Sequence, residues 1–141
     1  MVCSVVIEYA LNRKRMYSFL DYFFLVFHTL FMLFNAFGWL VIKWRIAHLI
    51  SLLLTGGSWF ILGIFYGIGY CPFTDWHWIV LREMGETDLP ASYVQYLLDR
   101  VFNISVTSTF ADYLTVSVFF VALAISLYIN ISAYYKSKKN R

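Results

Sequence analysis

Three long apolar stretches dominate this chain, and each carries a thin stripe of polar residues along one helical face. The stretches cover residues 17–42, 46–70 and 113–135, and each exceeds the roughly 20 apolar residues that a helix needs to cross a bilayer. Hydrocarbon offers polar groups no hydrogen-bond partners, so the stripes must face one another or a partner protein. The pattern therefore predicts an all-α integral membrane protein with three transmembrane helices.

The composition points the same way. The chain has 141 residues, of which 61% are hydrophobic and 13% charged, so it is too short and too apolar for a soluble domain with a separate anchor. The first stretch is too long for the apolar core of a secretory signal, and no small-residue cleavage pattern follows it. We expect a single membrane domain over 1–141, multi-pass, in the cell inner (cytoplasmic) membrane. The net charge of +3 lies mainly beside the apolar stretches, which favours lipid headgroups over nucleic acid as the partner.

The segments between the spans differ greatly in length. Residues 1–12 suggest a short interfacial helix, and Lys43-Trp44-Arg45 makes a tight hairpin of the first two spans. The second span is expected to end at Cys71-Pro72, because proline stops a helix. The segment 72–111 is then the one sizeable extramembrane loop. Counting Lys and Arg on each side gives nearly equal numbers, and we favour a cytoplasmic C-terminal tail with the loop outside.

Helical spacing aligns the polar residues within each span. In the first span Asp21, His28 and Asn35 are seven residues apart and share a face. Hydrogen-bonded helix packing explains such stripes, and a buried ligand or proton site around His28 is the alternative. A rise of about 1.5 Å per residue separates His28 and His48 by roughly 15 Å in depth, which argues against one shared metal ion. The candidates for the polar interior are His28, Asn35, His48, Ser51, Thr55, Ser58 and Asn130.

Small residues form a second face on the middle span. Gly56, Gly63 and Gly67 lie near one another on a helix, and Gly63-x-x-x-Gly67 is a motif that lets two membrane helices approach closely. We expect this face to take part in helix packing. Because three helices bury little surface, a larger assembly is expected.

The loop begins with the distinctive segment Cys71-Pro72-Phe73-Thr74-Asp75-Trp76-His77-Trp78. The structural interpretation is that Thr74 caps a short helix over 76–84, and that Ser92-x-x-Gln95 opens a second, amphipathic helix at the membrane surface. The functional interpretations are a metal site made from Cys71, Asp75 and His77, or a nucleophilic Cys71 with His77 as its base. No second cysteine or paired histidine lies nearby, and no orienting acid is evident. A Cys3–Cys71 disulfide would require an oxidising compartment.

At this segment the chain resembles the DUF2784 family of small bacterial membrane proteins. Cys71, Pro72 and Thr74 match the family's Cys-Pro-x-Thr motif, which follows a span rich in Gly. The resemblance covers most of residues 20–130 and includes His28, which corresponds to a histidine of the family's first helix. The chain departs from the family pattern at His77, where the family has Glu, and at 93–96, which replaces a Glu-His segment. The family has no assigned activity, so the resemblance implies an architecture and no reaction.

These observations favour a non-enzymatic membrane protein, an accessory or assembly subunit that acts through helix packing. The alternative is a membrane protein with a small-molecule, quinone or redox site in its polar interior. Transport is a third hypothesis, but three helices do not form inverted repeats. We assign no catalytic residue, metal or cofactor. The expected partners are the lipid bilayer and other membrane subunits or a second copy, with no nucleic acid. The candidate residues of the loop motif are Cys71, Pro72, Thr74 and His77.

Overall fold

The computed structural model describes the backbone of residues 2–139, and the side chains from residue 8 onward except that of residue 10. The described part is helical and contains no strand, and three of its segments are long and apolar enough to cross a membrane: Leu11–Leu40, Ile42–Tyr66 and Ser108–Lys139. The predicted all-α class, with three such helices and shorter ones between them, is confirmed. The elements are α1 (Val2–Phe37), the 3₁₀ turns η1 (Gly38–Leu40) and η2 (Ile42–Trp44), α2 (Arg45–Gly57), the π-helical turn η3 (Ser58–Leu62), α3 (Gly63–Tyr66), α4 (Pro72–Glu83), α5 (Tyr93–Phe102) and α6 (Ser108–Lys139).

The first helix is longer than the sequence pattern predicted. No separate lead-in helix exists within the described residues, because α1 runs without a break from Val2 to Phe37. The segment contains neither Gly nor Pro before Gly38, so nothing in it interrupts the helix. The 3₁₀ turns η1 and η2 then reverse the chain into α2.

The second membrane segment ends earlier than predicted, and for a different reason. Gly67, not Pro72, terminates the helix: Gly67 has φ 104° and its amide donates to the carbonyl of Gly63, as in glycine-terminated helix ends. Pro72 instead occupies the first turn of α4, where a missing amide hydrogen costs nothing. Between them the chain folds back, with the amide of Gly69 donating to the carbonyl of Trp59.

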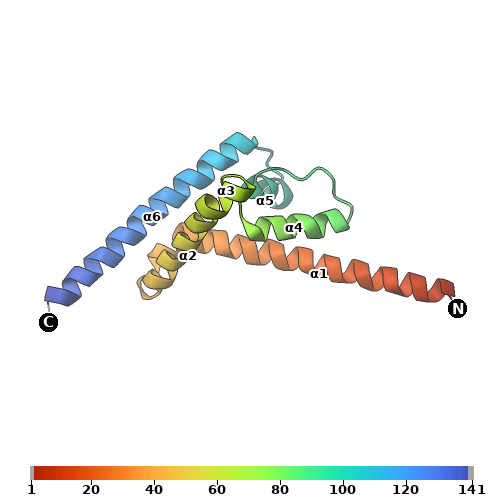
Figure 1. The fold of residues 1–141 in the computed structure, drawn as a ribbon, viewed down its shortest axis with the longest axis horizontal. Coiled ribbons are helices and arrows are strands. Elements are labelled where there is room, and N and C mark those ends of the chain that lie inside the picture. Colours follow the sequence, from red (N-terminus) through yellow and green to blue (C-terminus); the bar gives the residue numbers. More distant parts are fainter. Residues whose placement is uncertain (1, 140–141) are drawn as a thin grey trace.

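The long helices form a splayed arrangement (Figure 1). Helices α2 and α6 run antiparallel and side by side, whereas α1 crosses them near its C-terminal end and diverges towards the N-terminus. A small core of Leu52, Phe119 and Ala122 joins α2 to α6, with Trp39 and Trp59 packed against it.

The loop between the second and third spans folds onto α1. Helix α4 lies alongside α1, and α5 packs on α4 through the buried side chains of Trp78, Leu81 and Tyr93 (Figure 1). The pair α4–α5 is called the cap below. It reaches along the middle of α1, from Arg13 to Phe31, so the loop is a packed part of the fold.

The predicted side-chain caps of these two helices are wrong. Helix α4 begins at Pro72 with Cys71 as its N-cap residue, so Thr74 lies inside the first turn. Ser92 does occupy the N-cap position of α5, but its side chain makes no capping hydrogen bond. Proline at the first helical position supplies the start signal of α4, whereas α5 begins after Ser92 as the sequence predicted.

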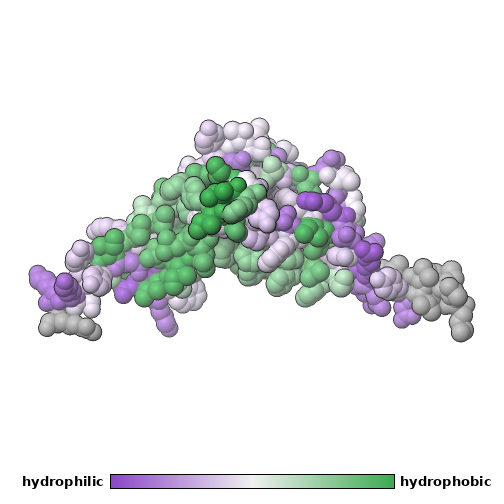
Figure 2. All heavy atoms as spheres, viewed as in Figure 1, coloured by the Kyte–Doolittle hydropathy of each residue, from purple (hydrophilic) through white to green (hydrophobic). Residues whose placement is uncertain are grey.

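Most large apolar side chains point outward (Figure 2). Apolar residues cover the visible faces of the long helices, while hydrophilic residues gather at the two ends of the molecule and around the cap. An aqueous protein would bury such side chains, so this surface fits a hydrocarbon environment and supports a multi-pass membrane protein.

Candidate functional site

A buried carboxylate lies where α1 meets the cap. The side chain of Asp21 on α1 is 5% exposed, and its two oxygens accept hydrogen bonds from the two terminal nitrogens of Arg100 on α5, both at 2.7 Å. Nε2 of His77 on α4 lies 2.9 Å from Asp21 Oδ1. One aspartate thus holds both cap helices against α1, by a bidentate ion pair to one and an imidazole to the other.

The partners of His77 determine its tautomer. Ionised Asp21 can only accept, so Nε2 of His77 carries the hydrogen. The other ring nitrogen, Nδ1, lies 3.0 Å from the hydroxyl of Tyr93 and must then accept from it. His77 is fully buried. The result is a directed chain in which Tyr93 donates to His77 and His77 donates to Asp21.

The surroundings of these hydrogen-bonded groups favour a neutral His77, a neutral Tyr93 and a charged Arg100. Burial lowers the pKa of His77 below its usual 6.5, against the opposing effect of Asp21. Burial also raises the pKa of Tyr93, so the phenol stays protonated and available as a donor. The hydrogen bond to Asp21 raises the pKa of Arg100 further. We call this set the charged cluster: Asp21, His77, Tyr93, Tyr96 and Arg100, with Arg100 also donating to the Tyr96 hydroxyl and lying over its ring.

A second histidine adjoins the charged cluster and is poorly satisfied. His28 is 4% exposed, and its ring centroid lies 4.0 Å from that of Tyr93. Its Nε2 lies 3.8 Å from Sγ of Cys71, at the long end for a thiol contact, and its Nδ1 has no partner among the described residues. If the thiol donates to Nε2, then Nδ1 carries a buried hydrogen without an acceptor, which costs about 1–3 kcal/mol.

A separate polar layer holds the span helices together. The amide of Asn35 on α1 donates to Thr55 Oγ1 at 3.0 Å and accepts from Ser51 Oγ at 2.6 Å, both on α2. Asn130 on α6 donates to the carbonyl of Arg45 at 3.1 Å. We call this set the neutral layer: Asn35, His48, Ser51, Thr55, Ser126 and Asn130.

His48 connects all three long helices within the neutral layer. Its Nε2 lies 3.1 Å from the carbonyl of Asn35 and its Nδ1 lies 3.2 Å from Ser126 Oγ. A backbone carbonyl can only accept, so Nε2 carries the hydrogen and the Ser126 hydroxyl donates to Nδ1. A Cβ at Gly38 would stand 2.6 Å from the His48 ring, so glycine permits this close approach.

The remaining predicted residues lie apart from both sets. Ser58 donates to the carbonyl of Tyr70 at 2.8 Å and so secures the folded-back segment after α3. A Cβ at Gly56 would meet the Phe119 ring of α6 at 3.3 Å. A Cβ at Gly63 would meet Ile68, and a Cβ at Gly67 would meet no atom within 4 Å. Within this chain, therefore, only Gly56 of the three faces another helix closely, and a role for the others in contacts between subunits stays a prediction.

The residues of the predicted loop site have separate partners. Cys71 faces His28, Asp75 accepts from the Tyr70 hydroxyl at 3.1 Å, and His77 belongs to the charged cluster. Among the residues that the structure describes, no three His, Cys, Asp or Glu side chains gather closely enough to hold a metal ion. The hypothesis of one metal or nucleophile site made from Cys71, Asp75 and His77 therefore lacks its geometry. The Cys3 side chain of the proposed disulfide lies outside the described part.

The central residues of the charged cluster were not among the candidates predicted from the sequence. Asp21 lies on the predicted polar stripe of the first span but not among the candidates, and Arg100 falls on the polar face of the predicted amphipathic helix. One signal was available: a carboxylate in an apolar span requires a cation, and Arg100 is one of the few cations of the loop.

The buried polar atoms of the charged cluster have most of their hydrogen-bonding capacity already used. Each polar atom of Asp21, His77 and Arg100 that points inward has a partner within the chain, so the charged cluster is built to hold helices together. A cleft beside it is lined by Tyr96, Arg100 and the acidic residues Glu86, Asp88 and Asp99. Spare hydrogen-bonding capacity remains at His28 and Cys71.

Comparison with known proteins identifies the family without adding a function. No curated protein and no solved structure matches the chain. The family model described as Protein of Unknown function (DUF2784) matches residues 18–131, which include α1 from Ser18 onward, both cap helices and most of α6. Because the match covers most of the chain and contains the resemblance at Cys71-Pro72-Phe73-Thr74, the chain belongs to the DUF2784 family.

Proposed function

We propose that the chain is an accessory or assembly subunit in a membrane and catalyses no reaction of its own. It packs its helices against another membrane protein or a second copy. The supporting observation is the division between its interior and its surface. Buried polar groups are paired with one another in the charged cluster and the neutral layer, whereas the outward faces of the long helices are apolar and aromatic. Such a chain offers contact surface and few reactive groups.

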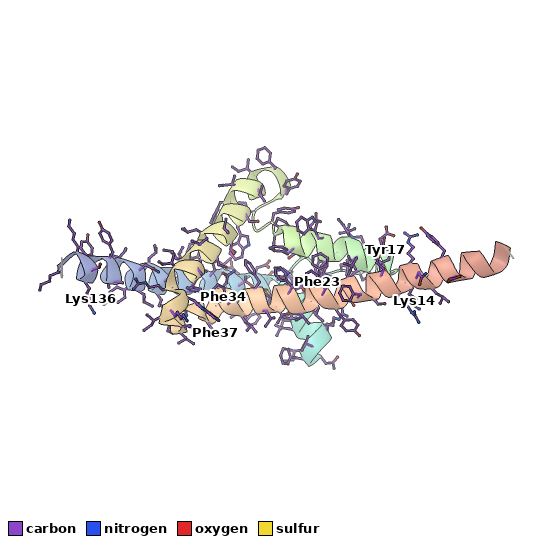
Figure 3. All side chains as sticks on the ribbon, turned by 90° about the horizontal axis from the view of Figure 1, so that it is seen from below. Lys14, Tyr17, Phe23, Phe34, Phe37 and Lys136 are labelled. Atoms are coloured by element: carbon purple, nitrogen blue, oxygen red, sulfur yellow. The ribbon has the colours of Figure 1, made fainter. Side chains whose placement is uncertain are left out.

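Helix α1 carries the most distinctive part of that surface. The rings of Phe23 and Phe27 stack at 5.8 Å, and those of Phe27 and Phe31 at 6.3 Å. Figure 3 shows Phe23 and Tyr17 on the part of α1 that extends beyond the α2–α6 pair. A shallow apolar hollow on this helix is lined by Phe19, Tyr22, Phe23, Val26, Phe27 and Leu30. Rigid aromatic side chains in a row suit helix-to-helix contact.

Native mass spectrometry and chemical crosslinking in a mild detergent test this function. We expect a homo-oligomer or a stoichiometric complex, and the double variant Phe19→Ala/Tyr22→Ala should weaken it. The matched control is Tyr128→Ala/Tyr134→Ala, which removes two exposed aromatic rings from α6 and should leave the assembly intact. A protein that is monomeric under all gentle conditions would contradict the proposal.

A second candidate function rests on His28. Among the described residues this buried histidine has no partner for its Nδ1, and a thiol lies near its other nitrogen, which supports a small-molecule, quinone or redox site. Asn35 and Ser58, two of the candidates for the polar interior, already have partners in the chain. Absorption spectra, metal analysis and lipid extraction of the purified protein test it. A protein free of chromophore, metal and quinone would count against it.

A further inference from the structure

The basic residues of one end of the molecule lie on the hairpin turn and on the last turns of α6. Lys43 and Arg45 lie at the start of the second membrane segment, and three lysines lie in the last turns of α6. The hydrogen bond from Asn130 to the carbonyl of Arg45 places α6 beside the start of α2, and α6 continues past this contact to its lysines (Figure 1). Figure 3 places Lys136 at this end, opposite Lys14 on α1. We call this set the basic end: Lys43, Arg45, Lys136, Lys138 and Lys139.

No acidic side chain lies in the sequence segments that carry the basic end. All eight acidic residues lie outside 22–74 and 113–141, and no salt bridge among the described residues involves a member of the basic end. The other end differs, because Arg13 pairs with Glu83 at 2.6 Å and Arg100 pairs with Asp21. The two ends have similar numbers of cations, but only the basic end keeps all of its positive charge available.

Aromatic residues set the depth of these cations in a membrane. Trp44, Tyr134 and Tyr135 are more than half exposed and flank the basic residues. Tryptophan and tyrosine prefer the boundary between hydrocarbon and headgroups. With these rings at that boundary, the lysine ammonium groups reach the level of the lipid phosphates, since long basic side chains extend toward the polar region.

We propose that the basic end binds anionic phospholipids of the leaflet into which it projects. The headgroup phosphate supplies the negative charge that the chain lacks there, and each cation near an anionic surface strengthens binding roughly fivefold. The same attraction holds the hairpin turn and the C-terminal end of α6 on the more anionic side of the bilayer. The partner is a lipid surface, and this binding does not require assembly with another protein.

Lipid competition followed by native mass spectrometry tests this surface. Purified protein in a mild non-ionic detergent is mixed with equal amounts of phosphatidylglycerol and phosphatidylcholine with the same acyl chains. We expect phosphatidylglycerol adducts to exceed phosphatidylcholine adducts by about tenfold or more, and the excess to shrink as ionic strength rises, because exposed charges are screened. The variant Lys136→Gln/Lys138→Gln/Lys139→Gln should lose most of this preference.

The matched control removes three cations from the other end. The variant Lys14→Gln/Arg15→Gln/Arg82→Gln changes the net charge equally and should keep the preference of the wild type. Thermal unfolding of both variants should match the wild type, since the residues are exposed. Equal loss in both variants, or no preference in the wild type, would overturn the proposal. Displacement of phosphatidylglycerol by millimolar inorganic phosphate would also overturn it, because the surface would then bind free anions.

Discussion

The charged cluster and the neutral layer use the same histidine chemistry for different purposes. In both, Nε2 of a buried histidine donates and Nδ1 accepts from a hydroxyl: His77 lies between Asp21 and Tyr93, and His48 lies between the Asn35 carbonyl and Ser126. The neutral layer contains no Asp, Glu, Lys or Arg side chain and joins the span helices. The charged cluster contains a full ion pair and joins the cap to α1.

This difference follows from what each region must resist. Inside the spans, the apolar surface of each helix already keeps it in the hydrocarbon. Neutral hydrogen bonds of about 0.6 kcal/mol each then determine which helix faces pack together. The cap must stay folded onto a helix that leaves the bundle, with few apolar residues buried between them. A desolvated Asp–Arg pair is strong when complete and costly when one partner is lost. The cap should therefore depend on single residues more than the spans do.

The largest effect is expected from Arg100→Met. It leaves Asp21 buried with one imidazole partner, and breaking a buried pair in this way costs about 3–5 kcal/mol. Thermal unfolding in detergent measures the loss. The double variant Asp21→Asn/Arg100→Met removes the stranded charge and should recover part of the stability. Equal stability of the single and double variants would mean that Asp21 is not desolvated.

Asn35→Leu should have a smaller effect on the neutral layer. The change removes two side-chain hydrogen bonds and should cost about 1–2 kcal/mol at the measured scale for membrane helices. Thr29→Val is the control, because the Thr29 hydroxyl bonds only to the carbonyl of Leu25 in its own helix. If both variants lose the same stability, Asn35 does not hold α1 to α2.

The pH dependence of stability should report the neutral state of His77. Because the pKa of His77 is lowered in the folded protein from its usual 6.5, the unfolded chain binds more protons below that pH. The stability from neutral His77 is therefore complete above about pH 6.5 and decreases as the pH falls. A second proton would also occupy Nδ1, where Tyr93 donates. His77→Gln should flatten the pH profile by comparison with the wild type, and an unchanged slope would contradict the neutral state.

Thr74→Ala should have the smallest effect. Because Cys71 is the N-cap and the Thr74 side chain makes no cap, the change should stay within about 0.5 kcal/mol. His77→Glu, by contrast, would place a second carboxylate beside Asp21 and should destabilise the cap. Unfolding temperatures of the two variants test this. A loss of about 1 kcal/mol for Thr74→Ala would restore the capping interpretation.

Hydropathy and helical spacing predicted the framework of the fold and the residues of one interface. The three apolar stretches correspond to the membrane-capable helices, and the polar stripes named Asn35, His48, Ser51, Thr55 and Asn130, which the structure brings together. These contacts follow from periodicity, since polar residues on an apolar helix must turn inward.

The cap could not be predicted in this way. Asp21 meets His77 and Arg100 across 56 and 79 residues of sequence, and a single chain carries no signal of such pairing. Local sequence signals also conflicted. Helix α4 begins at Pro72 and not at the capping motif of Thr74. The preceding membrane helix ends at Gly67, before the stop that was expected at Pro72. The second choice was open because glycine and proline both end helices.

Hydrogen exchange followed by mass spectrometry tests the central claim most directly, namely that separate polar sets hold the cap and the spans. In Arg100→Met, amides of α4 and α5 should exchange faster together while those of α2 and α6 keep the wild-type rate. In Asn35→Leu, exchange should rise where α1 meets α2 and stay unchanged in the cap. If either variant loosens both regions to the same extent, the two sets act as one unit and the account is wrong.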